Sequence, residues 1–366
     1  MKRVNYLDGL RAMAITAVLA VHWVASQFPI AYGGYVGVDI FFVLSGYIIT
    51  TIIWKQKVVR PIGALYLTFI RRRAVRLYPA LLGFVAGTLL IYAFFPGAPI
   101  SVGELVVPAI LAVTQGYSFY AGSGSAIATP FAITWSLSVE WMFYLFWPVV
   151  LFWAKSRGLA ASTLAKVSAG GAGVIYAIAL FQDEHWFYYG PAARIPELLV
   201  GCVLALMLQR DKSAAVVGAP WRHSLAAISA VAFVGFYTVF GPVQWSPVFR
   251  FVGLPLTVLA ACYLIWFGHR VPTSPLTTFL SWPPLTFIGR VSYSLYLWHM
   301  VGLNLFTTSN LGNVPLVAVA GISVILAVGM SLASYRLLEV PFLKSKTSRA
   351  TQALVVENET AATLRP

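Results

Sequence analysis

The sequence predicts an all-α integral membrane protein with about ten transmembrane helices plus one re-entrant or interfacial segment. Of its 366 residues, 59% are hydrophobic and only 10% are charged, and the mean hydropathy is +0.80. Soluble globular domains carry about a quarter charged residues. The composition therefore excludes a soluble enzyme and a disordered chain. The second observation is the spacing of long apolar runs between basic loops.

A transmembrane helix needs about 20 mostly apolar residues. Eleven apolar stretches lie at about 7–27, 35–54, 79–95, 104–120, 134–154, 167–182, 196–208, 223–240, 250–267, 285–307 and 315–338. If all eleven crossed, the basic loop between Lys155 and Lys166 would lie outside, against the positive-inside tendency. The stretch 104–120 contains Glu104 and Pro108, so we expect it not to span. Ten spans remain, with both termini in the cytoplasm.

The net charge of +14, from 25 basic and 11 acidic residues, fits cytoplasmic loops that contact anionic lipid rather than nucleic acid. We expect a transmembrane domain over residues 1–343 and a polar, disordered cytoplasmic tail over 344–366. Cys202 and Cys262 lie inside apolar runs without a CxxC spacing. The sequence therefore predicts no metal site.

Several arginines gather at the predicted inner face. Guanidinium groups bind phosphates in bidentate fashion, whereas a simple positive-inside anchor is the alternative. The anchor explanation suits Arg71 and Arg72 best. Arg73 and Arg76 share a helical face at i, i+3 spacing, and Arg11 lies inside an apolar run, so we expect these three to bind an anion.

A second polar group lies deeper. Counting about 1.5 Å per residue from the helix ends places His22, Asp39, Glu140 and His299 in one layer of the outer half. A histidine with a carboxylate partner suits general-base chemistry. The alternative, most relevant to His299, is a buried histidine that bonds a backbone carbonyl and serves packing.

Weaker candidates for substrate binding lie near this layer. Arg194 and Glu197 flank Pro196 at the mouth of the sixth span, where a simple ion pair is the alternative. Tyr144 shares a face with Glu140. Tyr296 precedes His299 in an aromatic run, and we count both of them among the residues that contact substrate. Ser45 lacks the strand–turn–helix context of a nucleophile elbow, so we do not assign it as a nucleophile.

The motifs, taken together, resemble the membrane-bound acyltransferase-3 family. They follow one another in order over nearly the whole chain. They are Tyr6-Leu-Asp8-Gly-Leu-Arg11-Ala, His22, Gly34-Tyr-Val-Gly37-Val-Asp39 continuing to Tyr47, Arg73-Ala-Val-Arg76, Thr134-Trp-Ser-Leu-Ser138-Val-Glu140 continuing to Tyr144, Arg194-Ile-Pro-Glu197, Ile288 to His299, and Glu339-Val-Pro341-Phe342.

The resemblance implies a multi-pass enzyme of the bacterial inner (cytoplasmic) membrane. It would move an acetyl or other short acyl group from cytoplasmic acyl-CoA, a co-substrate, to a sugar hydroxyl of a cell-envelope or exported polysaccharide. In this family the histidine matching His22 is catalytic, and the pair matching Arg73 and Arg76 serves donor binding. Many relatives carry a fused esterase-like domain outside the membrane. This chain ends about 25 residues after its last span, so we expect it to act without one.

These inferences combine into one hypothesis. The CoA head would rest near Arg11, Arg73 and Arg76, with Arg72 close by, and a single tunnel would lead to His22. There His22 would deprotonate the acceptor or briefly carry the acyl group, oriented by Glu140 or Asp39. Two alternatives are acylation of a small glycosylated metabolite such as a macrolide, and a proton-coupled transporter.

Overall fold

The computed structural model describes residues 4–25, 28–56, 61–95, 98–126, 128–210, 220–307 and 316–342, and these residues form helices with no strand. This confirms the all-α prediction. The predicted tail over 344–366 lies outside the described residues.

Ten long helices coincide with the ten predicted spans in the part of the chain that the structure describes. They are α1 (Asn5–Leu19), α2 (Val36–Lys55), α3 (Ile62–Phe94), α6 (Trp135–Ser156), α7 (Ala161–Ala179), α9 (Pro191–Arg210), α10 (Pro220–Phe240), α11 (Leu254–Arg270), α13 (Pro283–Thr307) and α14 (Leu316–Ser334). Eight of these segments are long and apolar enough to cross a membrane; α7 and α13 match the other two predicted spans.

The stretch predicted not to span forms a short helix. Helix α4 (Val102–Thr114) has 13 residues, about 20 Å at 1.5 Å per residue, against a hydrocarbon core of about 30 Å. It begins at a capping box in which Ser101 and Glu104 satisfy each other's backbone N–H groups. The helix is therefore too short to cross a membrane.

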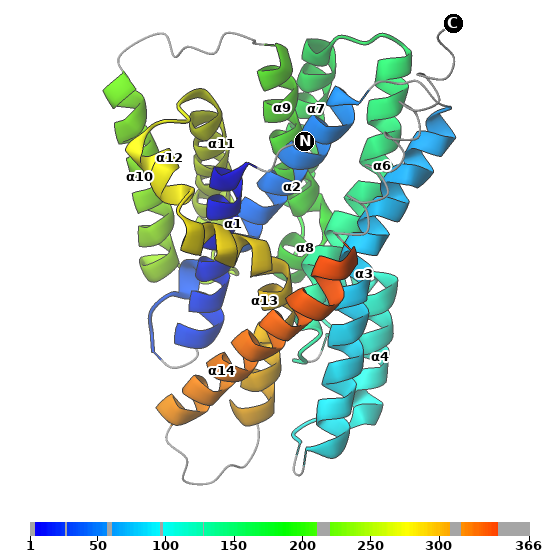
Figure 1. Ribbon diagram of the computed structural model, residues 1–366, viewed down its shortest axis with the longest axis vertical. Coiled ribbons are helices and arrows are strands. Elements are labelled where there is room, and N and C mark those ends of the chain that lie inside the picture. The colour runs from blue at the N-terminus through cyan, green and yellow to red at the C-terminus, as the bar shows by residue number, and fades with distance from the viewer. Residues whose placement is uncertain are drawn as a thin grey trace, which may run out of the picture.

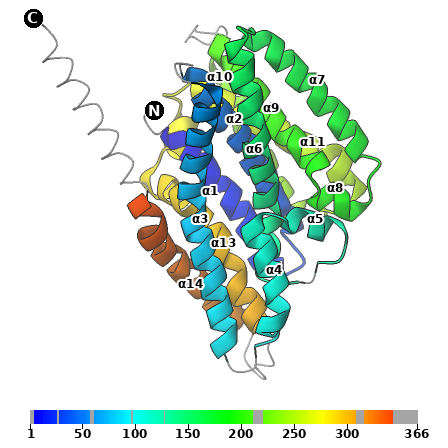
Figure 2. The ribbon, with the colours of Figure 1, turned by 90° about the vertical axis from the view of Figure 1, so that its right-hand side faces the viewer.

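Short helical pieces join the long ones. They are a π-helical turn η1 (Ala20–Val24) that continues α1, η2 (Tyr32–Tyr35), α5 (Tyr117–Gly122), η3 (Ala132–Thr134), α8 (Glu184–Tyr189), η4 (Phe249–Gly253), α12 (Pro275–Leu280) and η5 (Tyr335–Glu339). Figures 1 and 2 show α3 running along one side of the molecule with α4 against its lower half, and α14 beside α13. Helix α2 packs on α9, and α1 packs on both α2 and α13.

Glycines allow α2 and α9 to pack with their backbones in contact. A Cβ atom on Gly46 of α2 would lie 1.9 Å from the carbonyl oxygen of Leu198, and one on Gly201 of α9 would lie 2.2 Å from that of Val43. Small residues at helix interfaces are the usual means of close packing in membranes, where lipid is as apolar as the interface. This contact positions α2, which contributes to the site described below.

We expect Gly46→Ala to lower the free energy of unfolding by about 1–3 kcal/mol, because the added methyl group meets backbone rather than a movable side chain. Thermal unfolding in detergent measures this. Gly170→Ala on α7 is the matched control: a Cβ there meets nothing within 4 Å, so the change is expected to be neutral or slightly stabilising. Equal melting temperatures for the two variants would contradict the packing argument.

Candidate active site

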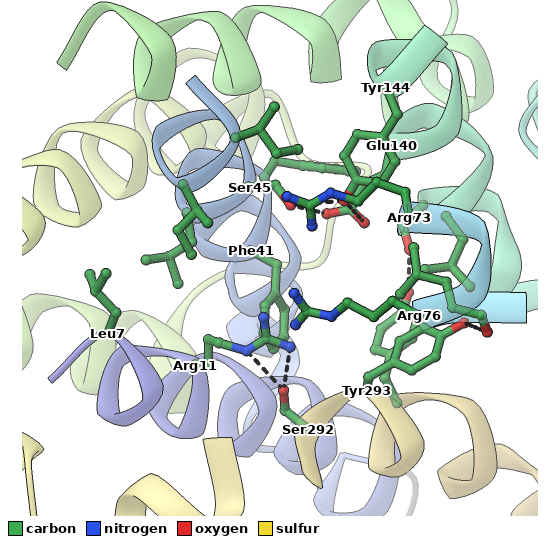
Figure 3. Close-up of a pocket in the computed structure, with 18 of the residues that line it drawn as sticks. Leu7, Arg11, Phe41, Ser45, Arg73, Arg76, Glu140, Tyr144, Ser292 and Tyr293 are labelled. Carbon is green, nitrogen blue, oxygen red and sulfur yellow. Dashed lines mark hydrogen bonds between the residues drawn. The ribbon is translucent and has the colours of Figure 1, made fainter. Parts of the chain in front are cut away.

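The larger cavity lies where α1, α2, α3, α6 and α13 meet, and we call it the arginine cavity. Its volume is about 570 Å³. Its apolar wall comes mainly from α2. Its polar lining consists of Asp8, Arg11, Ser45, Arg73, Arg76, Ser136, Glu140, Tyr144, Ser292, Tyr293 and Tyr296. Figure 3 shows that these side chains come from helices far apart in the sequence.

Arg11 is held in the arginine cavity by α13. Its Nη2 and Nε donate to the Ser292 hydroxyl at 3.0 and 3.3 Å, and Nε also reaches the carbonyl oxygen of Gly289 at 3.2 Å. Gly289 makes this possible, because a Cβ there would lie 1.8 Å from the carbonyl oxygen of Asp8. The guanidinium also lies over the ring of Phe41, at 5.8 Å. These contacts fix the direction of the Arg11 side chain.

Arg73 and Arg76 enter the same cavity from one face of α3, as their spacing predicts. The Arg73 guanidinium lies 5.4 Å from the rings of both Phe69 and Tyr144. Figure 3 shows the guanidinium groups of Arg76 and Arg11 pointing into the same part of the cavity. Like charges placed together in this way suit a bound anion with several oxygens.

Arg72 does not join them. Its side chain is exposed and does not line the arginine cavity. The structure therefore does not bring Arg72 together with Arg73 and Arg76, because it lies off the helix face that those two residues share.

Glu140 also lies in the arginine cavity. The Ser45 hydroxyl donates to its Oε1 at 2.5 Å, and the Tyr144 hydroxyl donates to its Oε2 at 2.9 Å. Arg73, whose guanidinium lies 5.4 Å from the Tyr144 ring, lines the same cavity. The sequence placed Glu140 beside His22. That contact is wrong, because Glu140 faces the arginines and His22 lies beyond the end of this cavity.

His22 pairs with the other predicted histidine. It lies in the π-helical turn η1, and its Nδ1 is 3.2 Å from Nε2 of His299. The Nδ1 atoms of the two rings also lie 2.8 and 2.7 Å from the carbonyl oxygens of Val18 and Tyr296. A carbonyl only accepts, so each neutral ring carries its proton on Nδ1. The Nδ1–H of His22 is then shared between the Val18 carbonyl oxygen and Nε2 of His299, and the Nε2 of His22 keeps its lone pair for a proton.

Asp39 does not orient His22 either. Arg194 Nη1 lies 2.8 Å from Asp39 Oδ1 and 2.8 Å from Glu197 Oε1, and the three side chains are at most 1% exposed. Arg194 Nε donates to the carbonyl oxygen of Tyr188. The ion pair considered for Arg194 and Glu197 is therefore confirmed, with Asp39 as a third member. These residues line neither cavity, so the structure does not bring them together with the other predicted site residues.

We expect Arg194→Met to lower the free energy of unfolding by about 3–5 kcal/mol, because it leaves two buried carboxylates without a counter-ion. Thermal unfolding in detergent measures the loss. Arg71→Met, at an exposed site on α3, is the control and should change it by about 0.5 kcal/mol or less. Adding Asp39→Asn and Glu197→Gln to Arg194→Met should recover part of the stability. No recovery would contradict the buried-charge explanation.

A second cavity lies next to the arginine cavity, and we call it the aromatic cavity. Its volume is about 300 Å³, and His22 lies in its wall. The rest of the lining combines small aliphatic side chains with six rings, which are those of Tyr35, Trp135, His185, Tyr188, Tyr189 and Tyr296. His299, predicted to contact substrate, is fully buried behind His22 and does not line this cavity. The sequence signal for this cavity, the aromatic run over residues 186–189, was missed.

The two cavities are separate. Only Val38 and Tyr296 line both of them. The Tyr296 hydroxyl donates to the carbonyl oxygen of Ile133 at 2.9 Å and lies 2.7 Å from the Ser136 hydroxyl. In place of the single tunnel predicted from the sequence, the structure has two adjacent cavities with Val38 and Tyr296 in their common wall.

Residues 4–335 match the family model for an acyltransferase domain. The chain belongs to the acyltransferase-3 family. It is 33% identical over 361 residues to "O-acetyltransferase OatA" of Staphylococcus aureus (strain NCTC 8325 / PS 47), covering 92% of this chain and 57% of that protein. It is 29% identical over 364 residues to "Peptidoglycan O-acetyltransferase OatA" of Listeria monocytogenes serovar 1/2a (strain ATCC BAA-679 / EGD-e), covering 94% and 56%.

This acyltransferase-family chain thus spans a little more than half the length of these relatives. No solved structure matches it. The family match covers every residue of both cavities, because all of them fall within 4–335.

Proposed function

We propose that the protein transfers an acetyl or other short acyl group from acyl-CoA to a hydroxyl of a sugar in a cell-envelope polysaccharide. The observation that carries the proposal is the pairing of two adjacent sites. One is a cavity with three arginines directed into it, and the other is a cavity with an imidazole whose Nε2 is available as a base. The names of the relatives, which are O-acetyltransferases, support the same reaction class.

The donor would occupy the arginine cavity as a co-substrate. The phosphates of CoA would lie against Arg11, Arg73 and Arg76. The pantetheine arm would follow the apolar wall of α2, which Leu44, Ile48 and Ile49 form. This arrangement fits a bacterial inner membrane protein whose N-terminus and arginine cavity face the cytoplasm, where acyl-CoA is found.

The acceptor would occupy the aromatic cavity. Flat aromatic rings with a few polar groups are typical of small-ligand sites, and Trp135, Tyr188 and Tyr189 offer faces to a sugar ring. His22 Nε2 would take the proton of the acceptor hydroxyl as its oxygen attacks the thioester carbonyl. The C–S bond then breaks, and the CoA thiolate leaves and takes up the proton that His22 holds.

His299 would position His22 in this reaction. Its Nε2 accepts the Nδ1 proton of His22 and so holds the ring in the tautomer that leaves Nε2 free. This is the role that a carboxylate plays in other histidine bases. A neutral partner stabilises the protonated form of His22 less than a carboxylate would. This suits a base that has to give up its proton again in each turnover.

The transporter alternative receives less support. A proton relay needs a chain of titratable groups. Among the described residues, the hydrogen bonds of the imidazole pair lead to backbone carbonyls and not to Glu140 or Asp39.

The test of the proposed function uses cells with and without the gene, given isotopically labelled acetate as the source of acetyl-CoA. Mass spectrometry of the envelope glycans should show a mass step of one acyl group that carries the label and depends on the gene. Label in a small secreted glycoside instead would favour the metabolite alternative. No gene-dependent acylation of either kind would overturn the proposal.

A further inference from the structure

The proposed reaction raises a geometric problem. The thioester would arrive in the arginine cavity, and the base lies in the wall of the aromatic cavity. Any acyl group that reaches an acceptor beside His22 has to pass the partition between them. Since only Val38 and Tyr296 line both cavities, the passage is defined by these two side chains.

The two side chains shared by the cavities are held in different ways. Val38 lies on α2, next to Asp39, which the buried Arg194 holds at 2.8 Å. Helix α2 is further fixed by its backbone contact with α9 at Gly46. Val38 is thus a fixed wall. Tyr296, in contrast, is held by its hydroxyl group, which contacts the Ser136 hydroxyl of α6 and the Ile133 carbonyl oxygen of η3.

The two hydrogen bonds of the Tyr296 hydroxyl, which we call the latch, involve residues of both cavities. Ser136 lines the arginine cavity, and Ile133 lines the aromatic cavity. Both partners are neutral groups, whose hydrogen bonds are weaker than those of charged groups, and breaking these two bonds releases the hydroxyl end of the phenol ring. When the two hydrogen bonds form again, the ring of Tyr296 returns to its place between the two cavities.

Tyr296 is also connected to the catalytic pair. Its carbonyl oxygen accepts from Nδ1 of His299 at 2.7 Å, and His299 in turn contacts His22. The ring of Tyr296 lies 5.7 Å from that of His299. The side chain that closes the passage and the backbone that orients the base thus belong to the same residue.

We infer that Tyr296 is a gate that opens to let the acyl thioester reach the acceptor cavity, and that the gap between Tyr296 and Val38 restricts transfer to short acyl groups. This inference rests on the proposed function. When the gate is closed, it separates the thioester from water and from the base. Acyl-CoA is then not hydrolysed in the absence of an acceptor.

The test measures release of CoA thiol by the purified full chain in lipid nanodiscs, with acetyl-CoA or octanoyl-CoA, and without acceptor. Tyr296→Ala should raise acceptor-free hydrolysis by about tenfold or more. It should also raise the octanoyl-to-acetyl rate ratio by about tenfold or more, because a narrow site discriminates between acyl chains by the methylene groups that it excludes. Tyr296→Phe removes the latch but keeps the ring. It should raise hydrolysis by a smaller factor and leave the ratio unchanged.

Two further variants complete the test. Val38→Ala widens the gap from the fixed side and should raise the octanoyl-to-acetyl ratio in the same direction even if Tyr296→Ala fails to fold. Tyr263→Ala truncates a tyrosine of α11 that lines neither cavity and should leave both readouts unchanged.

The possible failures can be told apart. An active native protein whose ratio and acceptor-free hydrolysis are unchanged by folded Tyr296→Ala, or by Val38→Ala, would overturn the gate alone. A native protein that releases no CoA from any thioester, with or without a glycan acceptor, would overturn the proposed function and the gate with it.

Discussion

Replacing His22 with glutamine is expected to reduce acyl transfer to a glycan acceptor by about 10²–10⁴-fold, the usual contribution of a general base. The amide has about the length of the imidazole but cannot take up a proton at the position of Nε2. His22 does not line the arginine cavity, so binding of acyl-CoA should stay at its native level. Parallel measurements of transfer rate and of donor affinity separate the two effects.

Two variants control this result. His299→Gln should cause a smaller loss than His22→Gln, because it removes the group that orients the base and not the base itself. His223→Gln, at a half-buried position on α10 where the ring contacts Tyr263, should leave transfer unchanged. A His22→Gln protein that still acylates at a near-native rate would end the assignment of His22 as the base.

The second large effect is expected from the arginine cavity. Arg76→Gln should weaken binding of acetyl-CoA by about 10- to 100-fold, because a hydrogen bond to a charged group contributes about 1.5–3 kcal/mol. Arg11→Gln should act in the same direction. Titration calorimetry with acetyl-CoA measures the affinity, and the exposed Arg71→Gln is the control.

The same variants distinguish a phosphate contact from a general disturbance of the site. Acetyl-pantetheine carries the thioester but no phosphate, so its turnover should be the same in Arg76→Gln and in the native protein. An equal loss with acetyl-CoA and acetyl-pantetheine would show that Arg76 supports the cavity and does not bind the donor phosphates.

Much of the fold followed from the sequence. The basic loops identified residues 104–120 as a segment that does not span, and the structure has only the short helix α4 there, followed by α5. Counting along the helices also brought His22 and His299 to the same depth, and the structure places their rings 4.9 Å apart.

The carboxylates show the limit of that reasoning. Depth along a helix gives the height of a residue but not the direction in which its side chain points. Glu140 faces the arginines, and Asp39 faces α9, where Arg194 lies 155 residues further along the chain. Their partners depend on which helices become neighbours, and nothing local in the sequence records that.

The role of Tyr296 as a gate could not be predicted from the sequence, for a related reason. Tyr296 lies in a motif that the sequence did single out, but its role depends on the latch to Ser136 and Ile133, 160 and 163 residues away. His22 lies in a π-helical turn, and such a turn changes the direction of a side chain from that in a regular α-helix. Side-chain interdigitation decides whether two pockets join or stay apart.

The most direct test of the account is a single-turnover experiment. The purified protein is mixed with radiolabelled acetyl-CoA and soluble glycan fragments of the cell envelope, and the label is followed. With the native protein, the label is expected to leave CoA and to appear as an ester on a sugar hydroxyl. When His22 is replaced with glutamine, the label is expected to stay on CoA. Label that remains on CoA with the native protein, although the donor and the acceptor both bind, would contradict it.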